Sequence, residues 1–75
     1  MNKIIEILED LKPGVDYKNI DNLIDGRYLD SLTILSLVSE LEEEYDIEIP
    51  TIEIIPNNFN SIEKINQLVE KLKEE

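Results

Sequence analysis

Three stretches of this chain repeat apolar residues with the period of an α-helix, and this pattern restricts the fold more than any other feature. Each stretch is apolar on one side and charged on the other, so each predicted helix must bury one face against its neighbours. The stripes comprise Ile4, Ile5, Ile7, Leu8 and Leu11; Ile34, Leu37, Val38, Leu41 and Tyr45; and Ile62, Ile65, Leu68, Val69 and Leu72. The sequence therefore predicts a small all-α bundle.

The segments between the stripes complete the prediction. Pro13-Gly14 ends the first helix, and residues 15–29 have no sustained period, which indicates a long first loop. Its apolar residues, expected to anchor it to the core, are Val15, Tyr17, Ile20, Leu23 and Ile24. The second helix should run over residues 31–45. Residues 1–75 are expected to form one domain of three main helices plus one short helix.

The region between the second helix and the last one is less regular. The stretch IEIPTIEII alternates like a strand, but Pro50 interrupts it, so we expect a connection with its isoleucines turned inward. Pro56 is expected to open a short helical turn that contains Phe59. Asn60, with Glu63 three residues later, is the predicted cap of the final helix.

The composition excludes several classes of function. The chain has 75 residues with no cysteine and no histidine, so it lacks a disulfide framework, a thiol nucleophile and the commonest general base. Its net charge of −11 would be repelled by nucleic acid and by anionic lipid, and favours basic partners instead. No apolar run is long enough to span a membrane, and no signal peptide is visible. We expect a cytoplasmic monomer.

A serine opens the predicted second helix where capping does not need it. Asp30 is a good N-cap, so the hydroxyl of Ser31 at the first helical position is left over. A phosphodiester on this oxygen would lie near free backbone N–H groups and the positive end of the helix dipole. Ser31 is therefore a candidate attachment site, although an Asp-Ser pair is also an ordinary start for a helix.

Two leucines of the second helix do not fit its apolar stripe. Leu32 and Leu35 point away from the centre of the stripe, on the side that carries Ser31, and Ser39 lies between their directions. They are either ordinary exposed or loop-covering leucines or part of a surface for a partner. The acidic run over residues 40–48 is likewise either a solvated helix face or a docking surface for basic partners.

Catalysis and metal binding find little support in the residue types. Nucleophilic catalysis by Ser31 would need an adjacent base, and there is no histidine to serve. A calcium loop that begins at Asp21 fails, because Leu23 and Leu32 occupy ligand positions 3 and 12. We expect neither an enzyme nor a dedicated metal site, and only weak binding of divalent ions by the acidic surface.

In the order and spacing of its motifs the chain resembles the acyl carrier protein family. The resemblance covers nearly the whole chain and rests on LDSLTILSLVSELEEEYDIEIP (residues 29–50) and IPNNFNSIEKINQLV (residues 55–69). It implies a four-helix bundle that bears 4′-phosphopantetheine, derived from coenzyme A, on the serine of Asp-Ser-Leu. It further implies that acyl or aminoacyl groups travel as thioesters on the thiol of this cofactor.

The resemblance also assigns roles to individual residues. Ser31 would be the attachment site, and Asp30 the acid that helps a phosphopantetheinyl transferase and its magnesium ion engage the serine. Two further sets match surfaces that meet partner enzymes, an apolar face beside the serine and acids that meet basic residues. These sets are Leu32, Leu35 and Ser39, and Glu40, Glu42 and Glu43. The other implied partners are a loading ligase or synthase and downstream transferases.

The cargo and one rival class remain open. Tyr28-Leu29 stands where fatty-acid carriers commonly have Gly-Ala, and the Asn-Phe-Asn-Ser stretch resembles carriers of amino acids, including D-alanyl and peptidyl carriers. Fatty acyl, D-alanyl, other aminoacyl and polyketide groups are all compatible with the motif. The rival is an acidic helical interaction domain that is never modified. A metal-responsive regulator is a remoter alternative, since the calcium pattern fails.

Overall fold

A computed structural model describes residues 2–74 and confirms the predicted all-α architecture. Within this range there are four α-helices, one 3₁₀ helix and no strand. The elements are α1 (Asn2–Leu11), α2 (Ser31–Tyr45), η1 (Thr51–Glu53), α3 (Pro56–Phe59) and α4 (Ile62–Lys73). None of the helices in residues 2–74 is long and apolar enough to cross a membrane.

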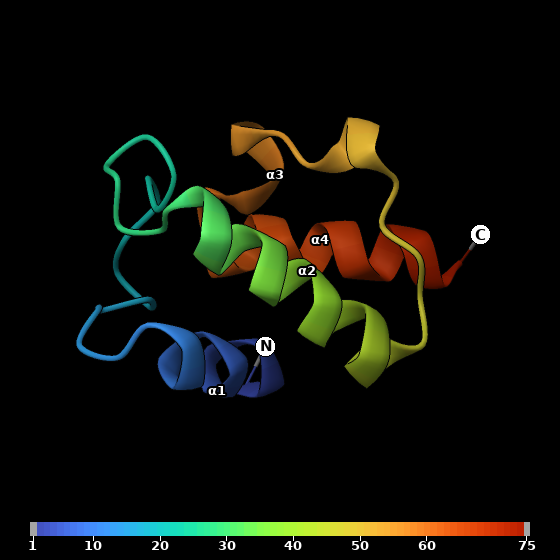
Figure 1. Cartoon of the computed structure of the whole chain (residues 1–75), viewed down its shortest axis with the longest axis horizontal. Coiled ribbons are helices and arrows are strands. Elements are labelled where there is room, and N and C mark those ends of the chain that lie inside the picture. Colours follow the sequence, from blue (N-terminus) through green and yellow to red (C-terminus); the bar gives the residue numbers. More distant parts are fainter. Residues whose placement is uncertain (1, 75) are drawn as a thin grey trace.

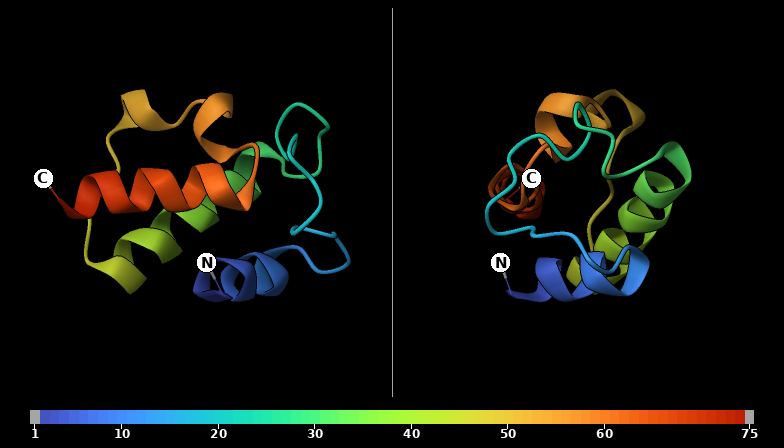
Figure 2. Two further views of the ribbon diagram at one scale, coloured as in Figure 1. Left: turned by 180° about the vertical axis from the view of Figure 1, so that it is seen from behind. Right: turned by 90° about the vertical axis from the view of Figure 1, so that its left-hand side faces the viewer.

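The helices surround a common core. α1 packs against both α2 and α4, α2 also packs against α4, and the short α3 packs against the helix that follows it. Seen from one end, the four helices surround the centre of the molecule (Figure 2, right). The segment between α1 and α2 closes one end of the bundle, so that the start of α2 lies next to this segment (Figure 1).

The core contains the apolar stripes that the sequence predicts. All five stripe residues of α4 are buried, as are Leu37, Val38 and Leu41 of α2. Ile34 and Tyr45 lie at the edges of the α2 stripe and are half-buried against the same core. Burial of these side chains is the main force that holds so small a chain together.

The long first loop, residues 12–30, is anchored as predicted. Tyr17 and Leu23 are buried, and the other predicted anchors are half-buried against the core. The Tyr17 hydroxyl donates hydrogen bonds to the backbone oxygens of Leu8, at 3.3 Å, and Lys12. Leu8 lies in the last turn of α1, where its oxygen also accepts from the Lys12 N–H at 2.7 Å, and Lys12 directly follows the helix. The loop is therefore bonded to the end of the helix before it.

The connection between α2 and α3 departs from the prediction. Ile49 is buried and Ile47 and Ile54 are half-buried, but Ile52 keeps 83% of its surface exposed and Ile55 is also exposed. The expectation that all these isoleucines turn inward is therefore wrong. The chain forms the unpredicted helix η1 at this point, and its short turn directs successive side chains to different sides.

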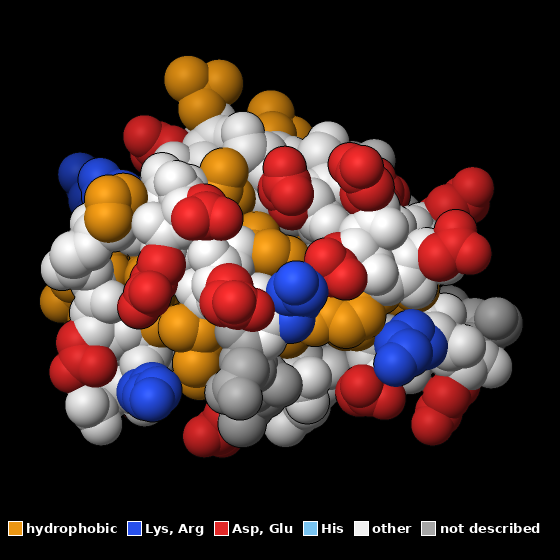
Figure 3. All heavy atoms as spheres, turned by 90° about the horizontal axis from the view of Figure 1, so that it is seen from below, with side chains coloured by type: hydrophobic (Ala, Val, Ile, Leu, Met, Phe, Trp, Pro, Cys, Tyr) orange, Lys and Arg blue, Asp and Glu red, His pale blue; other side chains and the backbone are white. Residues whose placement is uncertain are grey.

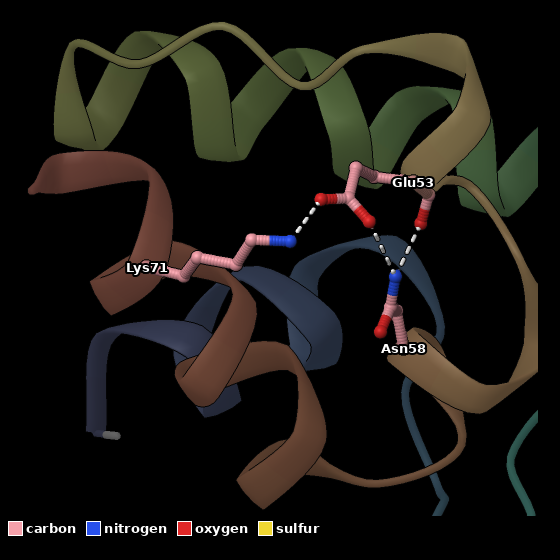
Figure 4. Close-up of polar contacts among 3 residues, drawn as sticks. All are labelled: Glu53, Asn58 and Lys71. Atoms are coloured by element: carbon pink, nitrogen blue, oxygen red, sulfur yellow. Dashed lines mark hydrogen bonds and ion pairs between the residues drawn. The ribbon is translucent and has the colours of Figure 1, made fainter. Parts of the chain in front are cut away.

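A polar cluster attaches η1 to the two helices that follow. Glu53 forms an ion pair with Lys71 of α4, and the Asn58 amide donates to the Glu53 backbone oxygen at 2.8 Å and to its carboxylate at 3.4 Å (Figure 4). The hydrogen bond from Lys71 lowers the pKa of the Glu53 carboxyl. The cluster joins three elements that the sequence pattern does not connect.

The cap of α4 lies one residue later than predicted. Ser61, not Asn60, is the N-cap, and its side-chain oxygen accepts a hydrogen bond from the backbone N–H of Lys64 at 3.1 Å. Both residue types are good caps, so the sequence alone does not separate them. The Asn60 side chain instead bonds to the long first loop.

Candidate functional site

Ser31 is the first residue of α2 and is exposed. Within residues 2–74 its hydroxyl has no hydrogen-bond partner, whereas the hydroxyl of Ser61 is used to cap α4. The oxygen therefore lies at the positive end of a 15-residue helix, beside first-turn N–H groups that have no partner in the helix. A reagent can reach this oxygen without disturbing the core.

Asp30 is the N-cap that the sequence predicts. Its backbone is extended, and its Oδ1 accepts a hydrogen bond from the Thr33 N–H at 2.8 Å. This hydrogen bond is the main reason why the pKa of the Asp30 carboxyl lies below its ordinary value of 3.8. Asp30 is therefore ionised at neutral pH, exposed, and directly adjacent to Ser31.

The apolar residues beside Ser31 lie on the solvent side of α2. Leu32 is 76% exposed and Leu35 is 57% exposed, and Ser39 is exposed as well. Leucines this exposed remove little apolar surface from water when the chain folds, so they add little to its stability. The structure therefore brings the predicted apolar recognition residues to the same side as Ser31 and leaves them open to a partner.

A pocket of about 290 Å³ adjoins the same site. Ser31 and Leu35 form part of its wall together with residues from the first loop and from the η1–α3 region. The full lining is Ile24, Ser31, Ile34, Leu35, Ile54, Ile55, Pro56 and Phe59. Apart from Ser31, every one of these side chains is apolar. An apolar group attached near Ser31 would thus have a surface against which to bind.

The predicted acidic residues divide into two kinds. Glu40 and Glu43 are exposed and form no ion pair within residues 2–74. Glu42 is half-buried, and its Oε2 accepts a hydrogen bond from the Ile49 N–H at 2.8 Å, so it holds the chain that leaves α2. The neighbouring Glu44 pairs with Lys3 of α1 at 3.6 Å. Glu40 and Glu43 are therefore the acids best placed to meet a basic partner.

Acidic side chains extend well beyond these two residues. Figure 3 shows them over much of one face of the molecule, with only a few basic groups among them. Exposed charges of one sign create a field that attracts basic partners over the range of the ionic screening length. The acidic surface would favour basic partners, and these stay a prediction.

Sequence reasoning missed part of this site. It named the residues of α2 but not Ile54 or Phe59 as part of the site, although they line the same pocket as Ser31. It also missed Asn60, whose amide bonds to the loop before Ser31. These residues are remote from Ser31 in sequence, and no local pattern indicates that they meet it.

Comparison with known proteins gives a consistent set of relatives. The chain is 33% identical over 72 residues to a D-alanyl carrier protein of Streptococcus sanguinis strain SK36, an alignment that covers 95% of this chain and 91% of the relative. It is 35% identical over 65 residues to the D-alanyl carrier proteins of Streptococcus pyogenes serotypes M5 and M1, over 87% of this chain and 77% of those proteins. No family profile and no solved structure matches the chain.

Proposed function

The chain belongs to the acyl carrier protein family, in its D-alanyl carrier branch, and we propose that Ser31 is the residue that receives 4′-phosphopantetheine. The chain is a carrier protein. The carrier family implies this cofactor, and its attachment to Ser31 is the further step that we propose. The 75 residues would then act as one carrier domain.

One observation supports this assignment above the others: the residue at the N-terminus of α2, directly after the N-cap Asp30, is an exposed serine whose hydroxyl has no partner within residues 2–74. In the reaction, the Ser31 oxygen would form a bond to the phosphorus that bears the pantetheine of coenzyme A. The diphosphate bond breaks, adenosine 3′,5′-bisphosphate leaves, and the hydroxyl proton passes to a base of the transferase. Asp30, whose carboxyl has a lowered pKa, directly precedes Ser31 in the chain and would help to hold the magnesium ion of the transferase.

The residues around Ser31 fit such a group. A phosphodiester on this oxygen would be stabilised by the first-turn N–H groups and the positive end of α2. When bound, the cofactor supplies a terminal thiol that holds acyl cargo as a thioester. The chain contains no cysteine, so none of its own side chains offers a competing thiol. The apolar wall formed by Leu35, Ile54 and Phe59 would exclude water from a group that rests against it.

Partner enzymes would dock on the side of α2 that carries Ser31. Leu32 and Leu35 would make small apolar contacts with these enzymes. Glu40 and Glu43 would attract basic residues of the transferase, of the loading ligase and of downstream enzymes. Such contacts favour fast association that weakens as salt rises. In this account the chain is a substrate of enzymes and performs no catalysis itself.

For the cargo we propose D-alanine, since the relatives of this chain from Streptococcus are named D-alanyl carrier proteins. The pocket of about 290 Å³ favours a second candidate, an apolar acyl chain, because an alanyl group would fill little of it. Loading of the modified chain with D-alanine and with a medium-chain fatty acid by their ATP-dependent ligases separates these candidates. Efficient loading with the fatty acid alone would overturn the first one.

The attachment is tested by intact mass. The wild-type chain is incubated with coenzyme A, magnesium and a broad-specificity phosphopantetheinyl transferase. The variants Ser31→Ala and Ser36→Ala are treated in the same way, and Ser36→Ala is the control because it replaces another exposed serine of α2. We expect a gain of one phosphopantetheinyl group on the wild type and on Ser36→Ala, and none on Ser31→Ala. An unmodified wild type would favour the rival interaction domain.

A further inference from the structure

We propose that Asn60 is a positioning residue that holds the loop before Ser31 in the shape that the phosphopantetheinyl transferase recognises. This inference rests on the proposed function of Ser31. Asn60 follows α3, while the loop, residues 22–29, immediately precedes Asp30 and α2. The two segments are some 35 residues apart along the chain and are joined in the folded structure.

Four hydrogen bonds link Asn60 to three consecutive loop residues. Its side-chain Oδ1 accepts from the N–H groups of Ile24, at 3.0 Å, and Asp25, at 3.1 Å. Its Nδ2 donates to the Asp25 carboxylate at 3.1 Å, and its backbone oxygen accepts from the Leu23 N–H at 2.8 Å. An amide side chain is required for this arrangement, since it both accepts and donates.

Hydrogen bonds within the loop connect the residues held by Asn60 to the start of α2. The Leu23 backbone oxygen accepts from the N–H groups of Tyr28, at 2.9 Å, and Leu29, at 3.1 Å. The side chain of Leu29 is buried, and Asp30 and Ser31 follow directly. A residue that fixes Leu23 therefore also fixes the backbone that leads into Ser31.

The loop is tightly folded and depends on such support. Arg27 lies in the left-handed region with φ of 62°, which is unfavourable for its side chain. A Cβ at Gly26 would come within 2.7 Å of the Asn22 backbone oxygen and 2.8 Å of the Tyr28 ring. Without the bonds from Asn60, this segment would open and spend less time in the observed shape.

Asn60 is not needed as the N-cap of α4, which is the most obvious alternative role for its side chain. Ser61 caps α4, so the Asn60 side chain is not required to begin that helix. Its carbonyl and amide groups are instead directed to the loop, and Ile24 of that loop lines the pocket together with Ser31. The position of Asn60 thus links the loop, the pocket and the attachment site.

The expected effect is on recognition rather than on chemistry. If the loop is in the competent shape for only a fraction of the time, the apparent affinity of the transferase for the chain falls to that fraction of its full value. Loss of the side-chain bonds should therefore raise the KM of the transferase for the chain by about five- to tenfold while kcat changes less than about twofold.

The test compares Asn60→Ala with Asn58→Ala under the same transferase assay. Asn58 belongs to the same short segment, but its side-chain amide donates to the Glu53 backbone oxygen, so it holds η1 and not the loop. We expect the increase in KM for Asn60→Ala only, accompanied by faster hydrogen exchange at the amides of Ile24 and Asp25. Equal KM values for Asn60→Ala and the wild type would overturn the inference while leaving Ser31 as the attachment site.

If Asn60→Ala folds poorly, a second set of variants tests the inference by exchanging the Asn60 amide and the Asp25 carboxylate. Asn60→Asp places a second carboxylate against that of Asp25 and should raise KM. The double variant Asp25→Asn/Asn60→Asp keeps the net charge and restores a donor facing an acceptor, so KM should return to within about twofold of the wild type. Failure of the double variant to recover while it is folded would contradict the inference. Absence of modification in the wild type itself would instead remove the proposed function.

Discussion

The buried and exposed faces of α2 share one helix backbone but meet different surroundings. Leu37 and Leu41 are fully buried in the core, whereas Leu32 and Leu35 on the other face remain 76% and 57% exposed. The first pair removes apolar surface from water and holds the bundle together. The second pair contributes little to folding and lies beside Ser31. Apolar residues of one helix thus take separate roles according to the direction in which their side chains point.

The largest expected effect is on stability when the buried face is changed. Leu41→Ala should lower the free energy of unfolding by about 2–5 kcal/mol, because it leaves a cavity in the core. Leu32→Ala on the exposed face should lower it by less than about 0.5 kcal/mol. Urea denaturation of both variants checks this, and equal losses would break the distinction between the faces.

The next effect is on docking when the exposed face is changed. Leu35→Ser should lower kcat/KM of the transferase for the chain by about three- to tenfold, because one apolar contact is lost, with little change in unfolding. Ile52→Ser serves as the control, since Ile52 is more exposed but does not line the pocket beside Ser31. Similar losses for both variants would show that general surface apolarity, and not this face, governs docking.

A smaller effect concerns pH at the start of the exposed face. The Asp30 pKa is lowered by the hydrogen bond from Thr33, so the ionised carboxyl stabilises the folded chain above its ordinary pKa of 3.8 and loses this effect as the pH falls through the lowered value. Asp30→Asn keeps the capping oxygen but does not titrate. The unfolding free energy of the wild type relative to Asp30→Asn should therefore decrease below about pH 4. A difference that stays constant with pH would contradict this account.

The smallest effect compares the two ends of α2. Arg27 and Asp46, on either side of the helix, both have positive φ, at 62° and 54°. Glycine adopts this conformation without steric cost, and aspartate tolerates it better than arginine does. Arg27→Gly should raise the free energy of unfolding by about 0.5 kcal/mol, and Asp46→Gly by less. Thermal unfolding of the two variants tests this prediction. A larger gain in the free energy of unfolding for Asp46→Gly than for Arg27→Gly would contradict it.

Local patterns predicted the helices and the direction of their side chains. A helix repeats every 3.6 residues, so the side on which a residue lies can be read from its close neighbours in the sequence. This period predicts both the buried stripe of α4 and the position of Leu35 outside the α2 stripe. The role of Asn60 could not be predicted, because its partners lie about 35 residues away and an adjacent serine is an equally good cap. The turn at η1 depends in the same way on Lys71, which is remote in sequence.

The candidate site was predicted only on the side that belongs to α2. Ser31 and Asp30 lie within one capping pattern, so the sequence indicates them together. The pocket needs Ile24, Ile54 and Phe59 from three separate segments. Their meeting depends on packing of the whole chain, which no local pattern contains.

We propose that the exposed face of α2 carries the attachment site, while its buried face holds the bundle together. Tandem mass spectrometry of peptides from the modified chain tests it most directly, because the chain has four serines, at positions 31, 36, 39 and 61. We predict that the phosphopantetheinyl group is found on Ser31 alone. Its location on Ser36, Ser39 or Ser61, or its absence from every peptide, would contradict the account.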